Sequence, residues 1–197
     1  QWNADGGNDT HFYGNSLMNV DQWYNIVITS DGNEYRMFIN GEEESLTFQT
    51  GSNNGDWFAD TDNRDNFSIG VLKYNNSMIS DLQAEIDEFS IWDRALNMEE
   101  IQNIMMSQLV GDEDGLIGYW NFNEGEGSTL TDLSGNGNHG TIYGAEWVEN
   151  IYGCTDSYAE NHNPDANWDD GSCAGYLDNG DYSLSFDGMN DWVSTGF

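Results

Sequence analysis

The sequence predicts an all-β fold: an antiparallel β-sandwich with one short helix, followed by a small module bracketed by two cysteines. Apolar and polar residues alternate in many short runs, turn residues separate these runs, and only one stretch has helical spacing. Aromatic residues make up 14% of the chain, which is enough for a packed core despite the acidic composition. We place the sandwich at 1–149, the module at 150–175 and a tail with one strand at 176–197.

The first strands are predicted as a hairpin. WYNIVIT at 23–29 is rich in β-branched residues, and EYRMFING at 34–41 alternates again after an Asp-Gly-Asn turn. The second run closes on Asn40-Gly41, a pair that favours a tight turn. Further strands are predicted at 66–72, 85–92, 115–122, 141–148 and 181–186.

The single helix is predicted to begin at Asn97. Asn97 is a good N-cap and Glu100 stands three residues later, as in a capping box. Apolar residues follow at helical spacing: Met98, Ile101, Met105 and Leu109. This stripe predicts a short helix that packs one side on a sheet.

The charge balance is extreme, with 36 Asp and Glu against 4 Lys and Arg, a net charge of −32. Because the charge is negative, we exclude a basic patch that would bind nucleic acid or an anionic membrane. Self-repulsion of this size destabilises a compact state unless salt screens it or hard cations such as Ca²⁺ bind. We expect Ca²⁺ as a cofactor; a purely solvated acidic surface is the alternative.

The ends and hydropathy of the chain suggest a piece of a larger protein. No stretch reaches the roughly 18 consecutive apolar residues of a spanning helix, so we expect no insertion into a membrane. The chain opens on Gln1, without a basic signal-peptide start. We therefore expect an internal or processed segment.

Three motifs carry a family resemblance, in the expected order: QWYNIVITSDGNEYRMFING at 22–41, IDEFSIWDRALNMEEIQNIM at 86–105 and GLIGYWNFNEGEGSTLTDLSGNGNHGTIYGAEW at 115–147. They resemble the laminin G-like domains, of the concanavalin A-like jelly-roll type, of secreted bacterial multidomain proteins. The resemblance implies a jelly-roll sandwich at a cell surface that lacks its first strands here.

The C-terminal part resembles pieces that follow such a domain. GCTDSYAENHNPDANWDDGSC at 153–173 is similar to GCTD…DDGSC modules between domains in secreted proteins of Bacteroidetes-type marine bacteria. YSLSFDGMNDWV at 182–193 resembles the opening strand of a following laminin G-like domain. The chain is thus either a window of a tandem array, or its tail strand pairs with the sheet of another copy.

A disulfide is predicted between Cys154 and Cys173. The segment between them is too polar to build its own core. Closing a loop of this length contributes about 3 kcal/mol by the chain-entropy estimate, and it requires an oxidising compartment. We therefore expect the protein to be secreted or at the cell surface.

Calcium ligands are predicted in two places. The resemblance implies that Asp187, Gly188 and Asp191 supply ligands from one side and Asp87 from the other. The two sets belong to successive domains here, so they meet only across copies or each with a partner outside the chain; the alternative for Asp87 is a structural hydrogen bond. The second set lies in the module, where Asp165-x-Asn167-x-Asp169 is near a calcium-loop pattern but lacks a closing Glu. Asp156 belongs to the same module set, and a solvated acidic linker is the alternative.

A ligand-binding loop is predicted at the rim of the sandwich. Its residues are Asp56, Trp57, Asp60 and Asp62. Trp57 could stack on a sugar ring, or pack against the sheet instead.

No catalysis is expected. Related jelly-roll glycosidases use E-x-D-x-x-E on one strand, whereas Glu85 and Asp87 are followed by Ser90 in place of the third acid. The three histidines are scattered without a zinc motif, and SGNGNHG lacks the Lys of a phosphate loop.

The expected function is an extracellular adhesive or structural repeat module, stabilised by Ca²⁺, that binds glycans, other surface proteins or further copies of itself. Two alternatives stay open. One is a filament or stalk subunit assembled by strand complementation between copies. The other is a carbohydrate-binding appendage of a secreted enzyme.

Overall fold

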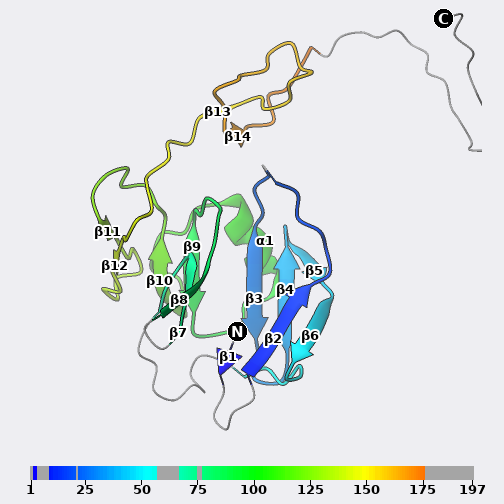
Figure 1. Ribbon diagram of the computed structural model, residues 1–197, viewed down its shortest axis with the longest axis vertical. Helices are drawn as coiled ribbons and strands as arrows, with labels where there is room; N and C mark the ends of the chain where they lie inside the picture. The colour runs from blue at the N-terminus through cyan, green and yellow to red at the C-terminus, as the bar shows by residue number, and fades with distance from the viewer. Residues whose placement is uncertain (1, 4–8, 21, 57–66, 75–76, 176–197) are drawn as a thin grey trace, which may run out of the picture. The chain divides into compact units, whose positions relative to one another are not determined.

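The computed structural model describes residues 2–3, 9–20, 22–56, 67–74 and 77–175 (Figure 1). The chain divides into two compact units, Gln1–Trp147 and Val148–Phe197. The predicted sandwich ended at 149, close to this division. The predicted tail at 176–197 lies outside the described residues.

The described elements are mostly short strands, which confirms the all-β class. The first unit contains β1 (Trp2–Asn3), β2 (Asp9–Gly14), β3 (Ile26–Ser30), β4 (Tyr35–Ile39), β5 (Glu42–Glu44), β6 (Leu46–Thr50), β7 (Val71–Tyr74), β8 (Ser77–Asp81), β9 (Phe89–Trp92), α1 (Met98–Met106), β10 (Leu116–Trp120), β11 (Thr129–Leu130) and β12 (Gly140–Thr141). The second unit contains β13 (Tyr152–Gly153) and β14 (Trp168–Asp169). In the first unit the order is β1-β2-β6 in one sheet and β3-β4-β5 in another, with the pairs β7-β8, β10-β9 and β11-β12, all antiparallel.

Two three-stranded sheets face each other through aromatic side chains. Phe12 of β2 and Phe48 of β6 lie with ring centroids 5.3 Å apart. Tyr35 of β4 is 1% exposed, and its ring centroid lies 5.1 Å from that of Phe12 and 6.5 Å from that of Phe48. These rings form the interior of the sandwich, where aromatic pairs add to the stability gained by burial.

The helix α1 covers the opposite face of the β3-β4-β5 sheet. Side chains alternate along β4, so Phe38 points away from Tyr35 and packs with Ile101 of α1 and with Leu96. Ile101 is fully buried. The predicted capping box is confirmed: Asn97 Oδ1 accepts from Glu100 N at 3.0 Å, and Glu100 Oε2 accepts from Asn97 N at 2.8 Å.

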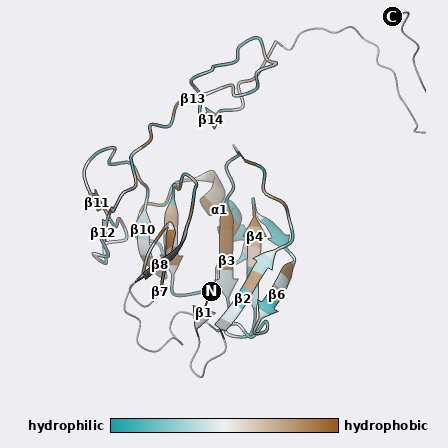
Figure 2. Cartoon of the chain, viewed as in Figure 1, coloured by the Kyte–Doolittle hydropathy of each residue, from teal (hydrophilic) through white to brown (hydrophobic). Residues whose placement is uncertain are grey.

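The β9-β10 pair carries a further aromatic cluster. The ring centroids of Phe89 on β9 and Trp120 on β10 are 5.9 Å apart, and Phe67 lies near both. Figure 2 shows apolar residues concentrated in the central strands and in α1, with hydrophilic residues in the connecting loops. None of the described helices is long and apolar enough to cross a membrane.

The predicted hairpin is confirmed as β3 and β4, with Asn40 and Gly41 at φ 50° and 77° in the following turn. Several strand boundaries differ from prediction, and in two strands the start is displaced by a residue with positive φ. β9 begins only at Phe89 because Glu88 adopts φ 52°, and β7 begins at Val71 because Gly70 adopts φ 81°.

The strand predicted at 141–148 was wrong in extent. Only Gly140–Thr141 forms a strand, paired with Thr129–Leu130. Gly144 adopts φ 79°, which ends the extended backbone. The strands β2 and β6, which belong to the β1-β2-β6 sheet, were not predicted.

Candidate binding surfaces and the disulfide-closed module

The stem of the predicted rim loop is fixed to the sandwich. Asn53 exchanges two hydrogen bonds with the Tyr35 backbone: Tyr35 N donates to Asn53 Oδ1 at 2.5 Å, and Asn53 Nδ2 donates to Tyr35 O at 3.3 Å. Gly55 is buried with φ 68°, and a Cβ there would lie 2.4 Å from the Glu34 backbone nitrogen. Asp56 Oδ2 accepts from Asn54 Nδ2 at 2.5 Å. The other predicted members, Trp57, Asp60 and Asp62, lie outside the described residues.

Asp87, a predicted calcium ligand, lies beside a carboxylate that the sequence did not single out as a site. Asp87 Oδ1 accepts from Glu88 N at 2.9 Å. Glu88 Oε2 accepts from the Tyr119 hydroxyl at 2.5 Å, and Glu88 Oε1 accepts from Gln108 Nε2 at 3.2 Å. Burial and this hydrogen bond raise the pKa of Tyr119 well above its usual range. Glu88 thus holds β10 to the start of β9. The proposed partners Asp187, Gly188 and Asp191 lie outside the described residues.

The Gly-rich loop after β11 is organised by one buried carboxylate, Asp132, which is 5% exposed. Its Oδ1 accepts from Tyr119 N at 3.0 Å and from Ser134 N at 2.9 Å, and its Oδ2 accepts from Asn138 N at 2.8 Å. Burial by itself raises the pKa of Asp132, but the backbone hydrogen bonds outweigh it and the pKa is lowered. The carboxylate is therefore ionised at neutral pH, and both of its oxygens accept hydrogen bonds from backbone N–H groups.

Side chains of the same loop close it against β10. Asn136 Nδ2 donates to Leu116 O at 3.2 Å, and Asn138 Nδ2 donates to Ile117 O at 2.9 Å. Ser134 Oγ also donates to Ile117 O, at 3.0 Å. These contacts give SGNGNHG a structural role.

The predicted disulfide is confirmed in the second unit. Cys154 and Cys173 are joined with an S–S distance of 2.07 Å and a Cα–Cα distance of 4.7 Å. Asn161 binds the backbone on both sides of Cys173. Its Nδ2 donates to Ser172 O at 2.7 Å, and its Oδ1 accepts from Ala174 N at 2.8 Å. Asn167 closes the entry to the module by accepting from Ile151 N at 2.7 Å and donating to Glu149 O at 3.0 Å.

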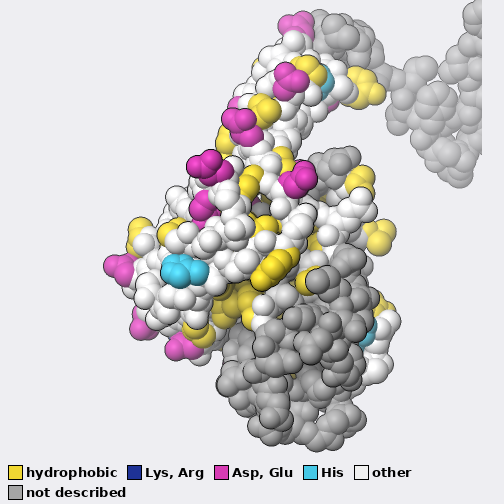
Figure 3. All heavy atoms as spheres, turned by 60° about the vertical axis from the view of Figure 1, so that its left-hand side comes forward, with side chains coloured by type: hydrophobic (Ala, Val, Ile, Leu, Met, Phe, Trp, Pro, Cys, Tyr) yellow, Lys and Arg dark blue, Asp and Glu magenta, His cyan; other side chains and the backbone are white. Residues whose placement is uncertain are grey.

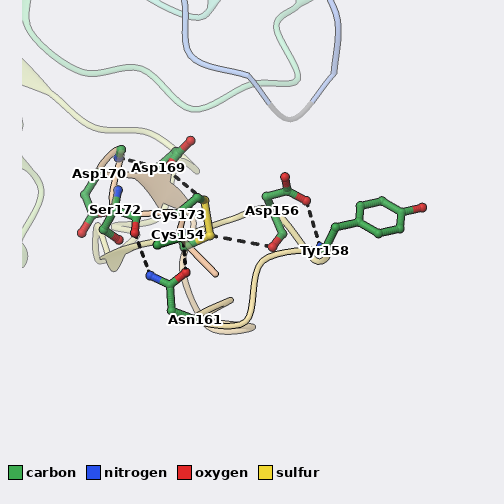
Figure 4. The surroundings of a disulfide bond; sticks show 10 residues. Cys154, Asp156, Tyr158, Asn161, Asp169, Asp170, Ser172 and Cys173 are labelled. Atoms are coloured by element: carbon green, nitrogen blue, oxygen red, sulfur yellow. Dashed lines mark hydrogen bonds between the residues drawn. A yellow bond between two sulfur atoms is a disulfide. The ribbon is translucent and has the colours of Figure 1, made fainter. Parts of the chain in front are cut away.

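The carboxylates of the module make local contacts. Asp156 Oδ1 accepts from Tyr158 N at 2.9 Å, and Asp169 Oδ1 accepts from Gly171 N at 3.0 Å. Figure 4 shows Asp156 on one side of the disulfide and Asp169 with Asp170 on the other. In the part of the chain that the structure describes, no group of three or more His, Cys, Asp or Glu converges on a point that could hold a metal. The predicted set Asp156, Asp165, Asn167 and Asp169 is therefore not brought together.

The acidic surface has few internal counter-charges. The two arginines whose side chains are described are both paired: Arg36 with Glu43 at 2.5 Å and Arg94 with Glu100 at 2.8 Å. These hydrogen bonds lower the pKa values of Glu43 and Glu100. Figure 3 shows Asp and Glu side chains spread over the described face, with hydrophobic side chains between them. Most carboxylates thus have solvent or dissolved cations as their counter-charge.

The family comparison agrees with this architecture. A family model described as the concanavalin A-like lectin/glucanases superfamily matches residues 1–102. The matched range ends within α1, so the motifs at 115–147 lie beyond it. No curated protein and no solved structure matches the chain. Because the family match covers more than half of the 197 residues, the chain belongs to the concanavalin A-like lectin/glucanases superfamily.

Proposed function

We propose that this chain is an extracellular module that binds glycans or neighbouring protein domains at a cell surface, as part of a larger repeat protein. The observation that carries the proposal is its membership of the concanavalin A-like superfamily. The disulfide between Cys154 and Cys173 supports an oxidising, extracellular location. Ser90 replaces the third acid of the glycosidase pattern, so we propose binding without hydrolysis.

The rim loop is the proposed ligand contact. Its stem is held at Asn53 and Gly55, so the residues that follow are carried by a fixed base. Loops positioned by a rigid scaffold are frequent ligand sites. Trp57 would stack on a sugar ring, and Asp56, Asp60 and Asp62 would accept hydrogen bonds from its hydroxyls.

Calcium stabilisation is part of the same proposal. A net charge of −32 with few internal counter-charges favours bound hard cations. The described carboxylates of the module do not converge, so we assign no calcium there. The proposed ligands are Asp87 on one side and Asp187, Gly188 and Asp191 on the other; the two sets belong to successive domains, so each would complete its site with another copy or with residues outside this chain.

Glycan-array binding of the full chain, with Ca²⁺ and with EDTA, tests this function. Trp57→Ala should weaken binding at least tenfold, whereas Tyr143→Ala, which removes an aromatic side chain that is 85% exposed elsewhere, should leave it unchanged. If both variants lost glycan binding to the same extent, the rim loop would not be the glycan contact. Undiminished binding in EDTA would remove the role of calcium and leave the binding function standing.

A further inference from the structure

The second unit presents an aromatic face to solvent. Its strands β13 and β14 are parallel, and the register places Tyr152 beside Trp168 (Figure 1). The two ring centroids lie 5.8 Å apart. Trp168 is half-buried, whereas Tyr152 is 59% exposed. The ring of Tyr152 is therefore accessible to a ligand, and the neighbouring ring of Trp168 restricts its movement.

The backbone that carries these two rings is fixed. Asn167 accepts from Ile151 N at 2.7 Å and donates to Glu149 O at 3.0 Å. Trp168 N also donates to Ile151 O, at 3.2 Å. The disulfide closes the same module. A ligand would therefore meet rings that are already held in place, which lowers the entropy cost of binding.

The charge of the module determines which kind of ligand fits the aromatic face. Residues 149–175 contain no Lys or Arg. Their acidic residues are Glu149, Asp156, Glu160, Asp165, Asp169 and Asp170. Repulsion between like charges disfavours an anionic partner and a second copy of this chain. A neutral sugar would use the rings but not the charge, whereas a cation would use both, because aromatic faces and carboxylates each attract positive charge.

The first unit shows how this chain accommodates a cationic side chain. Arg36 pairs with Glu43, and its Cζ lies 5.1 Å from the centroid of the Phe38 ring. Arg94 makes the same two kinds of contact, with a carboxylate at 2.8 Å and a ring centroid at 5.6 Å. Both arginines whose side chains are described thus contact a carboxylate and an aromatic ring at once. Residues 149–175 contain carboxylates and exposed rings but no cationic side chain of their own.

We propose that the aromatic face of Tyr152 and Trp168 binds an arginine-rich segment of a partner protein. A guanidinium group of the segment stacks on the Tyr152 ring, and the carboxylates of the module attract the positive charge of the segment. Arginine is favoured over lysine because the planar guanidinium stacks on a ring, whereas the compact ammonium is strongly hydrated. The site lies in the second unit and does not depend on glycan binding at the rim loop.

Peptide binding to the full chain, followed by fluorescence anisotropy without glycan, tests the proposal. The probe is a fluorescent peptide of four Gly-Arg repeats. Two reference peptides replace each arginine by lysine or by citrulline, which has the shape of arginine without its charge. The arginine peptide should bind at least twofold more tightly than the lysine peptide, and the citrulline peptide should show no measurable binding. Binding of the arginine peptide should weaken as the NaCl concentration rises.

A matched pair of variants separates the aromatic face from the general acidity of the chain. Tyr152→Leu keeps an apolar side chain next to Trp168 and leaves the net charge unchanged, but it removes the ring. It should weaken binding of the arginine peptide about two- to fivefold, the size expected for one exposed cation–π contact. Tyr143→Leu removes a ring that is 85% exposed in the first unit and should leave peptide binding unchanged. Tyr152→Phe keeps a ring and should bind like the wild type.

Three results would overturn the proposal. Equal peptide binding by Tyr152→Leu and Tyr143→Leu would leave only diffuse attraction to a chain of charge −32. Equal binding of the arginine and lysine peptides would contradict stacking of a guanidinium group. Displacement of the arginine peptide by the neutral sugar cellohexaose would assign the face to glycans. If proteolysis shows that Tyr152→Leu unfolds the module, the peptide comparison and the cellohexaose competition on the wild-type chain decide.

Discussion

Replacing Asp132 by Ala should destabilise the first unit more than any other single change to an acidic residue described here. The carboxylate accepts from three backbone N–H groups, those of Tyr119, Ser134 and Asn138. Only the hydrogen bond from Tyr119 is fully buried, while the loop amides of Ser134 and Asn138 can turn to water. Leaving a buried donor unpaired costs about 1–3 kcal/mol, so we expect a total loss of about 2–4 kcal/mol.

The assay is thermal and urea unfolding of the full chain, followed by circular dichroism. The expected loss corresponds to a fall in Tm of about 5–15 °C for a domain of this size. Asp132→Asn, which keeps one acceptor oxygen but turns an NH₂ group toward Asn138, should lie between the wild type and Asp132→Ala. An Asp132→Ala chain within about 0.5 kcal/mol of the wild type at pH 7 would refute the assigned role of the carboxylate.

The pH dependence gives an independent check. The pKa of Asp132 is lower in the folded chain than in the unfolded one, so its contribution to stability is present above the unfolded pKa. That contribution is lost as the pH falls through the folded pKa. The difference between wild type and Asp132→Ala should therefore be constant near neutral pH and shrink below about pH 4.

Further predictions concern the helix, the tyrosine contact, the disulfide and the metal. Ile101→Ala should cost about 2–5 kcal/mol in urea unfolding, because Ile101 is fully buried, whereas Met106→Ala at an 88% exposed position should be nearly neutral. Tyr119→Phe should cost about 1–3 kcal/mol in the same assay by removing a hydrogen bond to a carboxylate. Replacing Cys154 and Cys173 by Ser should expose the module to proteolysis while the unfolding midpoint of the first unit stays unchanged; protease resistance equal to that of the wild type would count against the stapling role. Millimolar Ca²⁺ should raise Tm more than NaCl of equal ionic strength, and equal shifts would leave only diffuse screening.

Features that depend on residues close together in the sequence could be predicted from the sequence. The β3-β4 hairpin was predicted from alternation and from Asn40-Gly41, because residues next to each other in sequence fix a tight turn. The helix start was predicted from Asn97 and Glu100, which satisfy each other's backbone within one turn. The disulfide was predictable because the described chain has no other cysteine with which Cys154 could pair.

The candidate sites were predicted only as residue types. Asp56 and Asp87 lie in the described part of the chain, where each accepts a hydrogen bond from a residue close to it in sequence. Their roles were hard to predict because the chain has 36 acidic residues, and many groups of them have spacings that would suit a site equally well. Asp132 was missed because its three donors come from β10 and from the loop, and nothing short of the folded chain brings them to one carboxylate.

The sequence by itself determined the all-β class, the hairpin, the capped helix, the disulfide and the acidic character, because each depends on composition or on residues close in the chain. Only the tertiary structure decided that β2 and β6 form the second layer, since their short runs become strands by packing Phe12 and Phe48 on Tyr35. It also decided that Ile26 and Ile28 face the interior without full cover. That outcome depends on which strand lies over which, and strand order across two layers is set by long-range packing that a one-dimensional pattern does not encode.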